Sequence, residues 1–179
     1  MVMTMSYGAA ETASEPVSVA ESFVKSLSLL EQAHRRLHDV VKDDLERGGE
    51  RHLTGVQALL LYEIGEHETP ASTLRSRGAF AGTSLSYNVK KLQEGGYLIQ
   101  SRSERDKRTV RLKLTERGHK VRQRVVDLFD RQATALEPTA SVRQDDLSQL
   151  NKTVSRLERF WTDQIRFQLW ISLQHSEYF

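Results

Sequence analysis

Cysteine is absent from this chain of 179 residues, and its absence excludes several kinds of site. Without a thiol there is no disulfide framework, no thiolate zinc site, no iron–sulfur cluster and no cysteine nucleophile. Long apolar runs are also missing, because none approaches the roughly 18 residues that a membrane span needs. This composition suits a reducing compartment and predicts a protein that does not enter a membrane.

The first residues contain neither the basic region nor the apolar region of a secretory signal. Residues 1–16 are small and polar, which predicts a disordered N-terminal tail. The length is that of one domain with extensions, enough to bury a core without disulfides or metals. We therefore expect a cytoplasmic location.

The small net charge of +2 conceals a strong polarity along the chain. The segment 75–124 holds fourteen basic and four acidic residues, so it carries +10 and leaves −8 for the remainder. Such a concentration of positive charge indicates a polyanionic partner. The alternative is a solvated basic surface without a partner.

Apolar residues at helical spacing flank this basic segment. They lie within residues 23–45 and again within residues 147–161, and Pro138 is expected to interrupt the helix that follows Thr115, or the turn just after that helix. A helix of about 30 residues is about 45 Å long, too long for one small core to cover. We therefore predict dimerisation helices in residues 17–52 and 115–179. The alternative is a helical bundle within one chain.

The segment 53–114 consists of short elements with clear boundaries. Their order predicts three helices and a hairpin, which is a winged helix-turn-helix lobe. The fold is thus expected to be mainly α with a small β-hairpin: this lobe plus long N- and C-terminal dimerisation helices. Thr54 is expected to cap the first helix, and Thr69-Pro70 to supply the cap and first helical position of the second. The third helix is expected at 83–94, ended by Gly95-Gly96, and the strands at 97–99 and 109–114.

The helix at 83–94 is expected to turn one face to DNA. Leu85, Val89 and Leu92 share the opposite face, toward the core. A helix fits the major groove, where short polar side chains reach base edges and lysines neutralise phosphates. The candidate contacts are Thr83, Ser84, Ser86, Tyr87, Asn88, Lys90 and Lys91, with Ser86 and Asn88 on the flanks and Asn88 able to pair with an adenine edge. The alternative is an ordinary amphipathic helix with a wet outer face.

The loop between the two strands is polar and rich in arginine. A two-stranded ribbon with a basic tip can place an arginine in a narrow minor groove, where the potential is most negative. Arg105, Lys107 and Arg108 are the candidate wing contacts, the first two above all. Asp106 is expected to pair with Arg108 or Arg102 and hold the loop in shape. The alternative is a flexible, solvated hairpin tip.

Residues 53–118 resemble the multiple-antibiotic-resistance regulator (MarR) family of bacterial transcription factors. The family's wing motif, Asp-x-Arg-Asp-x-Arg, stands here at 103–108 with serine in place of the first aspartate, and Leu114 to Gly118 match Leu-Thr-x-x-Gly. The resemblance implies a homodimer in the bacterial cytoplasm that offers two recognition helices and two wings to a pseudo-palindromic duplex. It also implies that Arg105 is the minor-groove arginine.

Regulators of this kind often bind a small, commonly aromatic effector between the dimer helices and the DNA-binding lobe. The candidates for such a pocket are His34, His38 and Tyr62; the alternative is that they are packing or interface residues. His34 and His38 are four residues apart and so suit a metal, but thiolates and a further ligand constellation are missing. We expect no metal site and no cofactor.

The sequence contains no Gly-x-Ser-x-Gly elbow, P-loop or Rossmann fingerprint, so we do not expect an enzyme. The prediction is a dimeric, sequence-specific transcriptional regulator, a repressor released by a small-molecule effector. A winged-helix protein–protein adaptor is one alternative, and a small-molecule or metal sensor with incidental DNA affinity is another. An adaptor requires apolar residues on the outer face of the 83–94 helix, which carries serine, tyrosine and lysine.

Overall fold

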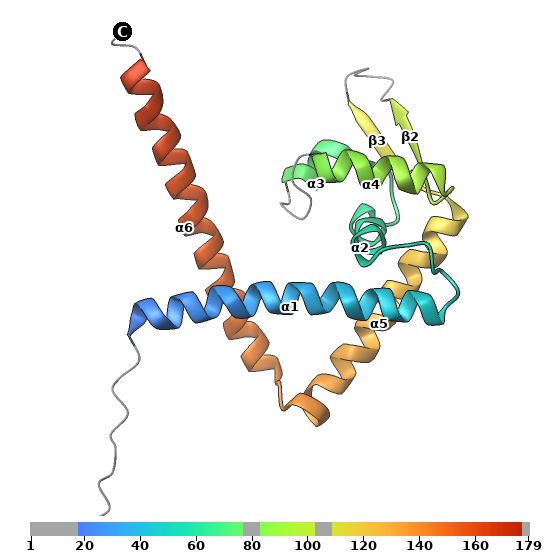
Figure 1. The fold of residues 1–179 in the computed structure, drawn as a ribbon, viewed down its shortest axis with the longest axis horizontal. Helices are drawn as coiled ribbons and strands as arrows, with labels where there is room; N and C mark the ends of the chain where they lie inside the picture. The colour runs from blue at the N-terminus through green and yellow to red at the C-terminus, as the bar shows by residue number, and fades with distance from the viewer. Residues whose placement is uncertain (1–17, 77–82, 103–108, 177–179) are drawn as a thin grey trace, which may run out of the picture. The chain divides into compact units, whose positions relative to one another are not determined.

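The computed structural model describes residues 18–76, 83–102 and 109–176. As predicted, the described chain is mainly helical with a small sheet (Figure 1). It divides into two compact units, Met1–Val125 and Val126–Phe179. The elements are α1 (Val19–Arg47), α2 (Gly55–Ile64), β1 (Thr69–Pro70), α3 (Ala71–Ser76), α4 (Thr83–Glu94), β2 (Leu98–Arg102), β3 (Val110–Leu114), α5 (Glu116–Ala140) and α6 (Gln144–Ser176).

The long helix α1 begins at a reciprocal cap. The Oγ of Ser18 accepts a hydrogen bond from the amide of Glu21 at 3.1 Å, and the Glu21 carboxylate accepts one from the amide of Ser18 at 2.9 Å. Only the C-terminal third of α1 contributes to the core, through Val41 and Leu45. Most of the helix therefore remains exposed, as its length predicted.

Helix α2 begins at the predicted cap, Thr54, and packs against α1. Gln57 closes the same kind of reciprocal cap, and the helix buries Leu60 and Leu61 completely. Gly55 lies directly on the backbone carbonyl of His38, where a Cβ atom would collide. A residue without a side chain is therefore needed where the two helices meet.

The three strands form one antiparallel sheet in the order β1-β3-β2. The prediction that Thr69-Pro70 opens a helix is wrong, because these residues form β1, with Thr69 opposite Leu112 on β3. The hydroxyl of Thr69 donates to the carbonyl of Ile64 at 2.9 Å, so it closes the preceding turn and caps nothing. Proline is tolerated because β1 is an edge strand that does not need every N–H. Helix α3 starts one residue later.

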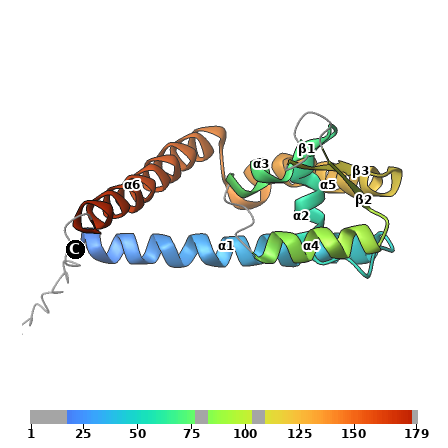
Figure 2. The ribbon, with the colours of Figure 1, turned by 90° about the horizontal axis from the view of Figure 1, so that it is seen from above.

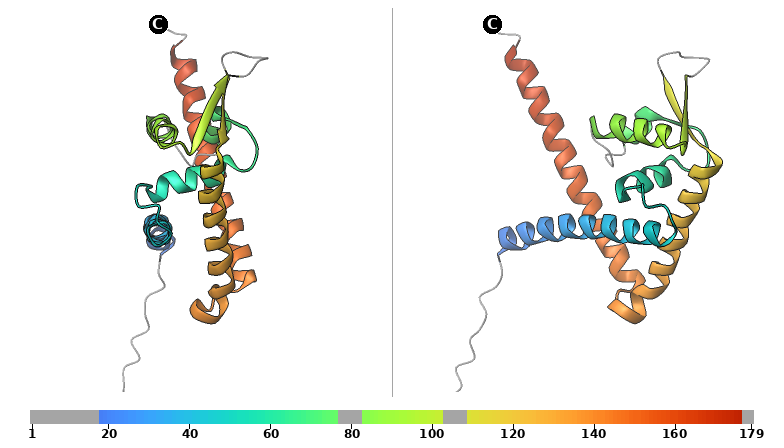
Figure 3. Two further views of the ribbon diagram at one scale, coloured as in Figure 1. Left: turned by 90° about the vertical axis from the view of Figure 1, so that its right-hand side faces the viewer. Right: turned by 45° about the vertical axis from the view of Figure 1, so that its right-hand side comes forward.

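The lobe closes around the apolar face of α4. Leu85 and Leu92 on this helix are buried, as is Leu112 on β3, and strand β2 packs against α4 (Figures 1 and 2). Both views in Figure 3 show α4 at the edge of the lobe. Burial of one side thus leaves the other side of α4 open to a partner.

In the second unit, α5 continues through Pro138 and ends at Ala140. The chain turns just after the proline, where Ser141 adopts a left-handed conformation (φ 55°). Helix α6 then begins after a cap in which the carboxylate of Asp146 accepts from the amide of Arg143 at 2.9 Å. None of the described helices of either unit is long and apolar enough to span a bilayer.

Candidate nucleic-acid interface

The outer face of α4 is polar and basic. Its buried face holds Leu85 and Leu92, of which 1% and 0% are exposed, whereas 62% of Tyr87 is exposed on the other side. The exposed side chains of this face are Ser84, Ser86, Tyr87, Lys90 and Lys91. Thr83 begins the helix, and its side chain lies outside the described residues. Five of the seven predicted recognition-helix residues are therefore on one accessible surface.

Asn88 departs from the prediction, because its side chain is buried. Its amide nitrogen donates to the carbonyl of Ser84 at 2.8 Å, one turn earlier in the helix. A flank position on an ideal helical wheel did not reveal which way the side chain would turn. This internal bond engages one hydrogen of the Asn88 amide in the structure, and the contact of Asn88 with an adenine edge stays a prediction.

The two lysines of α4 share one acidic neighbour. The Nζ atom of Lys91 lies 2.9 Å from the Glu94 carboxylate, and the Nζ atom of Lys90 lies 4.0 Å from it. The hydrogen bond between Lys91 and Glu94 raises the pKa of the lysine and lowers that of the carboxyl. All three groups are exposed, so water and salt screen these pairs and leave the lysines available to phosphates.

The C-terminal end of α4 is held by three side chains from three segments, which we call the Glu50 cluster: Glu50, Tyr97 and Arg117. The Tyr97 hydroxyl donates to Glu50 Oε2 at 2.6 Å, and a guanidinium nitrogen of Arg117 lies 3.1 Å from the same oxygen. The Arg117 guanidinium also stacks 4.1 Å from the centre of the Tyr97 ring.

Hydrogen bonding, charge and burial in the Glu50 cluster shift the pKa values of the Glu50 carboxyl and the Tyr97 hydroxyl in opposite directions. The hydrogen bond from Tyr97 lowers the pKa of Glu50. Burial, followed by the nearby Glu50 carboxylate, raises the pKa of Tyr97 to about 12. The carboxylate therefore stays ionised and the phenol stays protonated at neutral pH, which is the arrangement that this hydrogen bond requires.

The turn after α4 is also fixed by the start of α5. The Thr115 hydroxyl donates to the carbonyl of Gly96 at 2.7 Å and accepts from the amide of Gly118 at 3.1 Å. Gly118 lies against the Tyr97 carbonyl so closely that a Cβ atom would collide with it. The Leu-Thr-x-x-Gly pattern thus has a physical reason: threonine caps α5, and glycine admits the backbone of the turn.

The wing residues lie outside the described part of the chain. These are Arg105, Lys107 and Arg108, together with Asp106, so their predicted roles stay predictions. The flanking strands are in antiparallel register as far as Arg102, opposite Val110.

One family model, described as a winged helix DNA-binding domain, matches residues 53–118. The exopolysaccharide II synthesis transcriptional activator ExpG of Rhizobium meliloti is 34% identical over 143 residues, which cover 78% of this chain and 71% of ExpG. A mutant of MarR from E. coli, complexed with operator DNA, shares the fold with a TM-score of 0.61 and 16% identity over 79% of this chain and 99% of that chain. The chain belongs to the MarR family of winged helix transcriptional regulators.

A second solved structure extends this likeness of fold. The PcaV regulator from Streptomyces coelicolor, in complex with its natural ligand, has a TM-score of 0.62 and 20% identity, over 82% of this chain and 98% of that chain. The family and these relatives are regulators and not enzymes, in agreement with the missing catalytic motifs.

In this MarR family member, the structure brings two of the three predicted effector residues together. The Nε2 atoms of His34 and His38 lie 3.2 Å apart, with the rings nearly perpendicular. Burial, and then the neighbouring His34, lowers the pKa of His38, whose Nδ1 atom is buried without a hydrogen-bond partner. Tyr62 is half-buried on α2.

An open cavity of about 730 Å³ lies beside α1. His38 lines it together with Gln32, Asp39 and Val56, whereas His34 and Tyr62 are not among the described residues of its lining. Within the described ranges, no group of three or more histidine and carboxylate side chains is placed to hold a metal ion.

One basic residue beside α4, Arg75, is not among the DNA contacts predicted from the sequence. A groove of about 340 Å³ runs between α3, α4 and the sheet, with Arg75 and Lys90 on its sides and Val89 and Leu112 among its apolar residues. Arg75 was counted in the basic segment but was not chosen as a contact. Arg75 belongs to another helix, α3, and no local sequence pattern indicates that the fold brings it beside α4.

Proposed function

We propose that the protein is a dimeric regulator that binds a pseudo-palindromic stretch of duplex DNA. The observation that carries this proposal is the division of α4 into a buried leucine face and an exposed face of serine, tyrosine and lysine. Such a helix can lie in the major groove with Ser84, Ser86 and Tyr87 at base edges and Lys90 and Lys91 at phosphates.

The wing of each subunit would add a minor-groove contact beside the major-groove contact of its own α4. The antiparallel strands β2 and β3 lead directly into residues 103–108, which supports their position at the tip of a ribbon. We propose that Arg105, with Lys107 as the second candidate, enters the minor groove, that Arg108 is a further wing contact, and that Asp106 holds the loop.

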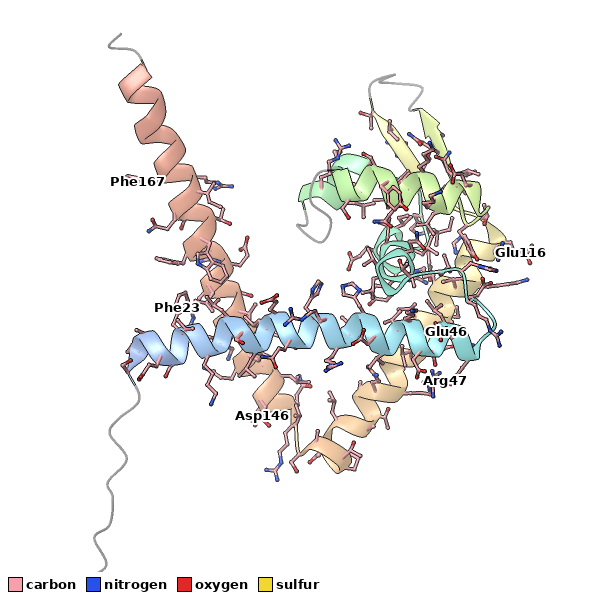
Figure 4. All side chains as sticks on the ribbon, viewed as in Figure 1. Phe23, Glu46, Arg47, Glu116, Asp146 and Phe167 are labelled. Atoms are coloured by element: carbon pink, nitrogen blue, oxygen red, sulfur yellow. The ribbon has the colours of Figure 1, made fainter. Side chains whose placement is uncertain are left out.

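Dimerisation is supported by apolar side chains that the single chain leaves exposed. On α1, Val24 and Leu29 are more than half exposed. On α6, Ile165 and Phe167 are about 60% exposed (Phe23 of α1 and Phe167 are labelled in Figure 4). Exposed apolar side chains at helical spacing mark an interface, and a second copy of the same helices would cover them.

The direction of regulation has two candidates. From the sequence we predicted a repressor that a small, possibly aromatic, effector releases from DNA in the bacterial cytoplasm, and the cavity beside His38 and the ligand complex of PcaV support an effector. ExpG is a transcriptional activator, and its role favours activation of transcription by this chain. A reporter fused to a bound promoter separates the two, because deletion of a repressor raises expression and deletion of an activator lowers it.

The test of DNA binding uses a duplex selected from random sequences and fluorescence anisotropy with the full-length chain. Arg105→Ala is expected to weaken binding by about 1–3 kcal/mol. Lys90→Ala should reduce the slope of log affinity against log salt by about 0.9, the share of one phosphate contact. Lys152→Ala removes an exposed lysine of α6 and serves as the control. Wild-type affinity in both lobe variants, or an affinity independent of salt, would contradict the proposal.

A further inference from the structure

The C-terminal end of α4 is bonded to two other segments of the chain, and the role of these bonds in DNA recognition rests on the proposed function. The leucines of α4 give it a buried face that packs on the core. Directional bonds at the end of the helix add to this packing and define its orientation further. Arg117 supplies one, because it donates to the carbonyl of Gly95 at 3.0 Å while it also holds Glu50.

Glu50 extends this attachment to the arm of the molecule. It lies three residues after the end of α1, in the connection to α2, and 67 residues from Arg117 and 47 from Tyr97 in sequence. One carboxylate oxygen therefore joins the end of α1, the turn after α4 and the first turn of α5. Its side chain is only 26% exposed, so these bonds are better protected from water than those of the surface pairs.

A second attachment ties the same end of α1 to α5. Arg124 forms an ion pair with Asp44, with 2.7 Å between Nε and Oδ2, and donates to the Asp44 carbonyl. Glu46, Arg47 and Glu116, labelled in Figure 4, mark where α1 ends and α5 begins. Because α1 and α5 are joined independently of Glu50, loss of Glu50 should loosen the link between the end of α1 and the turn after α4 without separating the two longer helices. The bonds of Thr115 and Arg117 to the turn itself would remain.

We propose that Glu50 is a positioning residue for DNA recognition, which sets the orientation of α4 relative to α1 through Tyr97 and Arg117. In a dimer formed through α1, that orientation decides the distance and angle between the two recognition helices. Specific binding needs both helices in register with two half-sites, whereas non-specific binding to phosphates does not. Glu50 therefore acts on specificity more than on general DNA affinity.

The test compares affinity for the selected duplex with affinity for a scrambled duplex of the same length and composition. Glu50→Gln and Tyr97→Phe are each expected to weaken binding to the selected duplex roughly fivefold or more, with little change for the scrambled duplex. The double variant should lose much less than the product of the two single losses, because Glu50→Gln weakens, and Tyr97→Phe removes, the same hydrogen bond. Glu46→Gln is the control, since Glu46 is an exposed acid of α1 that pairs with Lys42.

Tyr97→Phe removes a single hydroxyl, and its thermal unfolding curve shows that it is folded at the assay temperature. Selected-duplex affinity like that of the wild type in both folded variants would overturn the proposal. Equal losses on both duplexes would overturn it as well, because they indicate a general structural effect. A wild-type chain that binds no duplex would instead refute the proposed function itself.

Discussion

At the scale of single residues, two neighbouring aspartates of α1 meet very different surroundings. Asp43 is largely exposed and pairs with Arg47 one turn later, whereas Asp44 is 7% exposed and pairs with Arg124 of α5. Adjacent residues of a helix point about 100° apart, so one faces water and the other faces the core. The partner that makes Asp44 structural is 80 residues away, beyond the reach of any local pattern.

Asp44→Asn should therefore lower the free energy of unfolding by about 1–3 kcal/mol, with the lower end favoured because Arg124 is one-third exposed. The substitution keeps the shape of the side chain and removes the charge that faces Arg124. Urea denaturation measures the change. Asp43→Asn is the matched control and should have a much smaller effect, since exposed pairs contribute little. Equal effects of the two variants would contradict the structural role of Asp44.

Tyr87 is the large side chain exposed on the outer face of α4, and it is the sharpest single test of that face. Tyr87→Ala should weaken binding to the selected duplex by about 1–3 kcal/mol if the ring contacts base edges. Tyr87→Phe should retain much of the affinity if apolar contact dominates and lose it if the hydroxyl carries the contact. Anisotropy titrations provide both values. An unaffected Tyr87→Ala would remove this residue from the interface.

At the scale of elements, local patterns predicted most of the lobe. The cap at Thr54, the bounds of α4 and its leucine face all follow from residues close in sequence. The failures involve long-range partners. The residue types of Thr69-Pro70 favour a helix start. These residues instead pair with β3, which lies some 40 residues later in the chain, and form an edge strand. The sequence predicts correctly that Asn88 lies on the helix. Its burial depends on tertiary packing, which a helical wheel does not represent.

The junction between β3 and α5 provides a prediction about an element. Gly118→Ala should lower the free energy of unfolding by about 1–3 kcal/mol, because the new methyl group collides with the Tyr97 carbonyl and the backbone cannot easily yield. Alanine otherwise favours a helix, so propensity alone predicts the opposite sign. Lys120→Ala, an exposed position of the same helix, is the control. A Gly118→Ala variant as stable as the wild type in urea would contradict the close approach.

At the scale of the whole molecule, positive and negative charge are concentrated in different parts of the chain. The segment 75–124 carries +10 and contains α4, the wing and the groove residue Arg75, while the rest of the chain carries −8. A near-neutral total therefore hides a basic segment, and acidic charge elsewhere in the chain would favour the orientation in which this segment faces DNA. The fold and the exposed polar face of α4 follow from the sequence, whereas the Glu50 cluster does not, because its members come from three separate segments.

The oligomeric state is the second property at this scale. Ile165→Asp places a charge on an exposed apolar position of α6 and should convert the dimer to a monomer, because an unpaired charge at a buried interface is costly. Light scattering after size exclusion would then give 20.5 kDa in place of twice this mass. Gln164→Asp adds the same charge at the next position and is the control. A wild-type chain that is monomeric at micromolar concentration would contradict the dimer.

The most direct test of the account is selection of bound duplexes from random DNA by the full-length protein, followed by sequencing. Two recognition helices related by a two-fold axis predict a motif of two inverted half-sites, with centres about 10 base pairs or a multiple apart. A-tract preference where the wings enter the minor groove is expected beside each half-site. No enriched sequence, or an enriched motif without two-fold symmetry, would contradict a dimeric DNA-binding regulator.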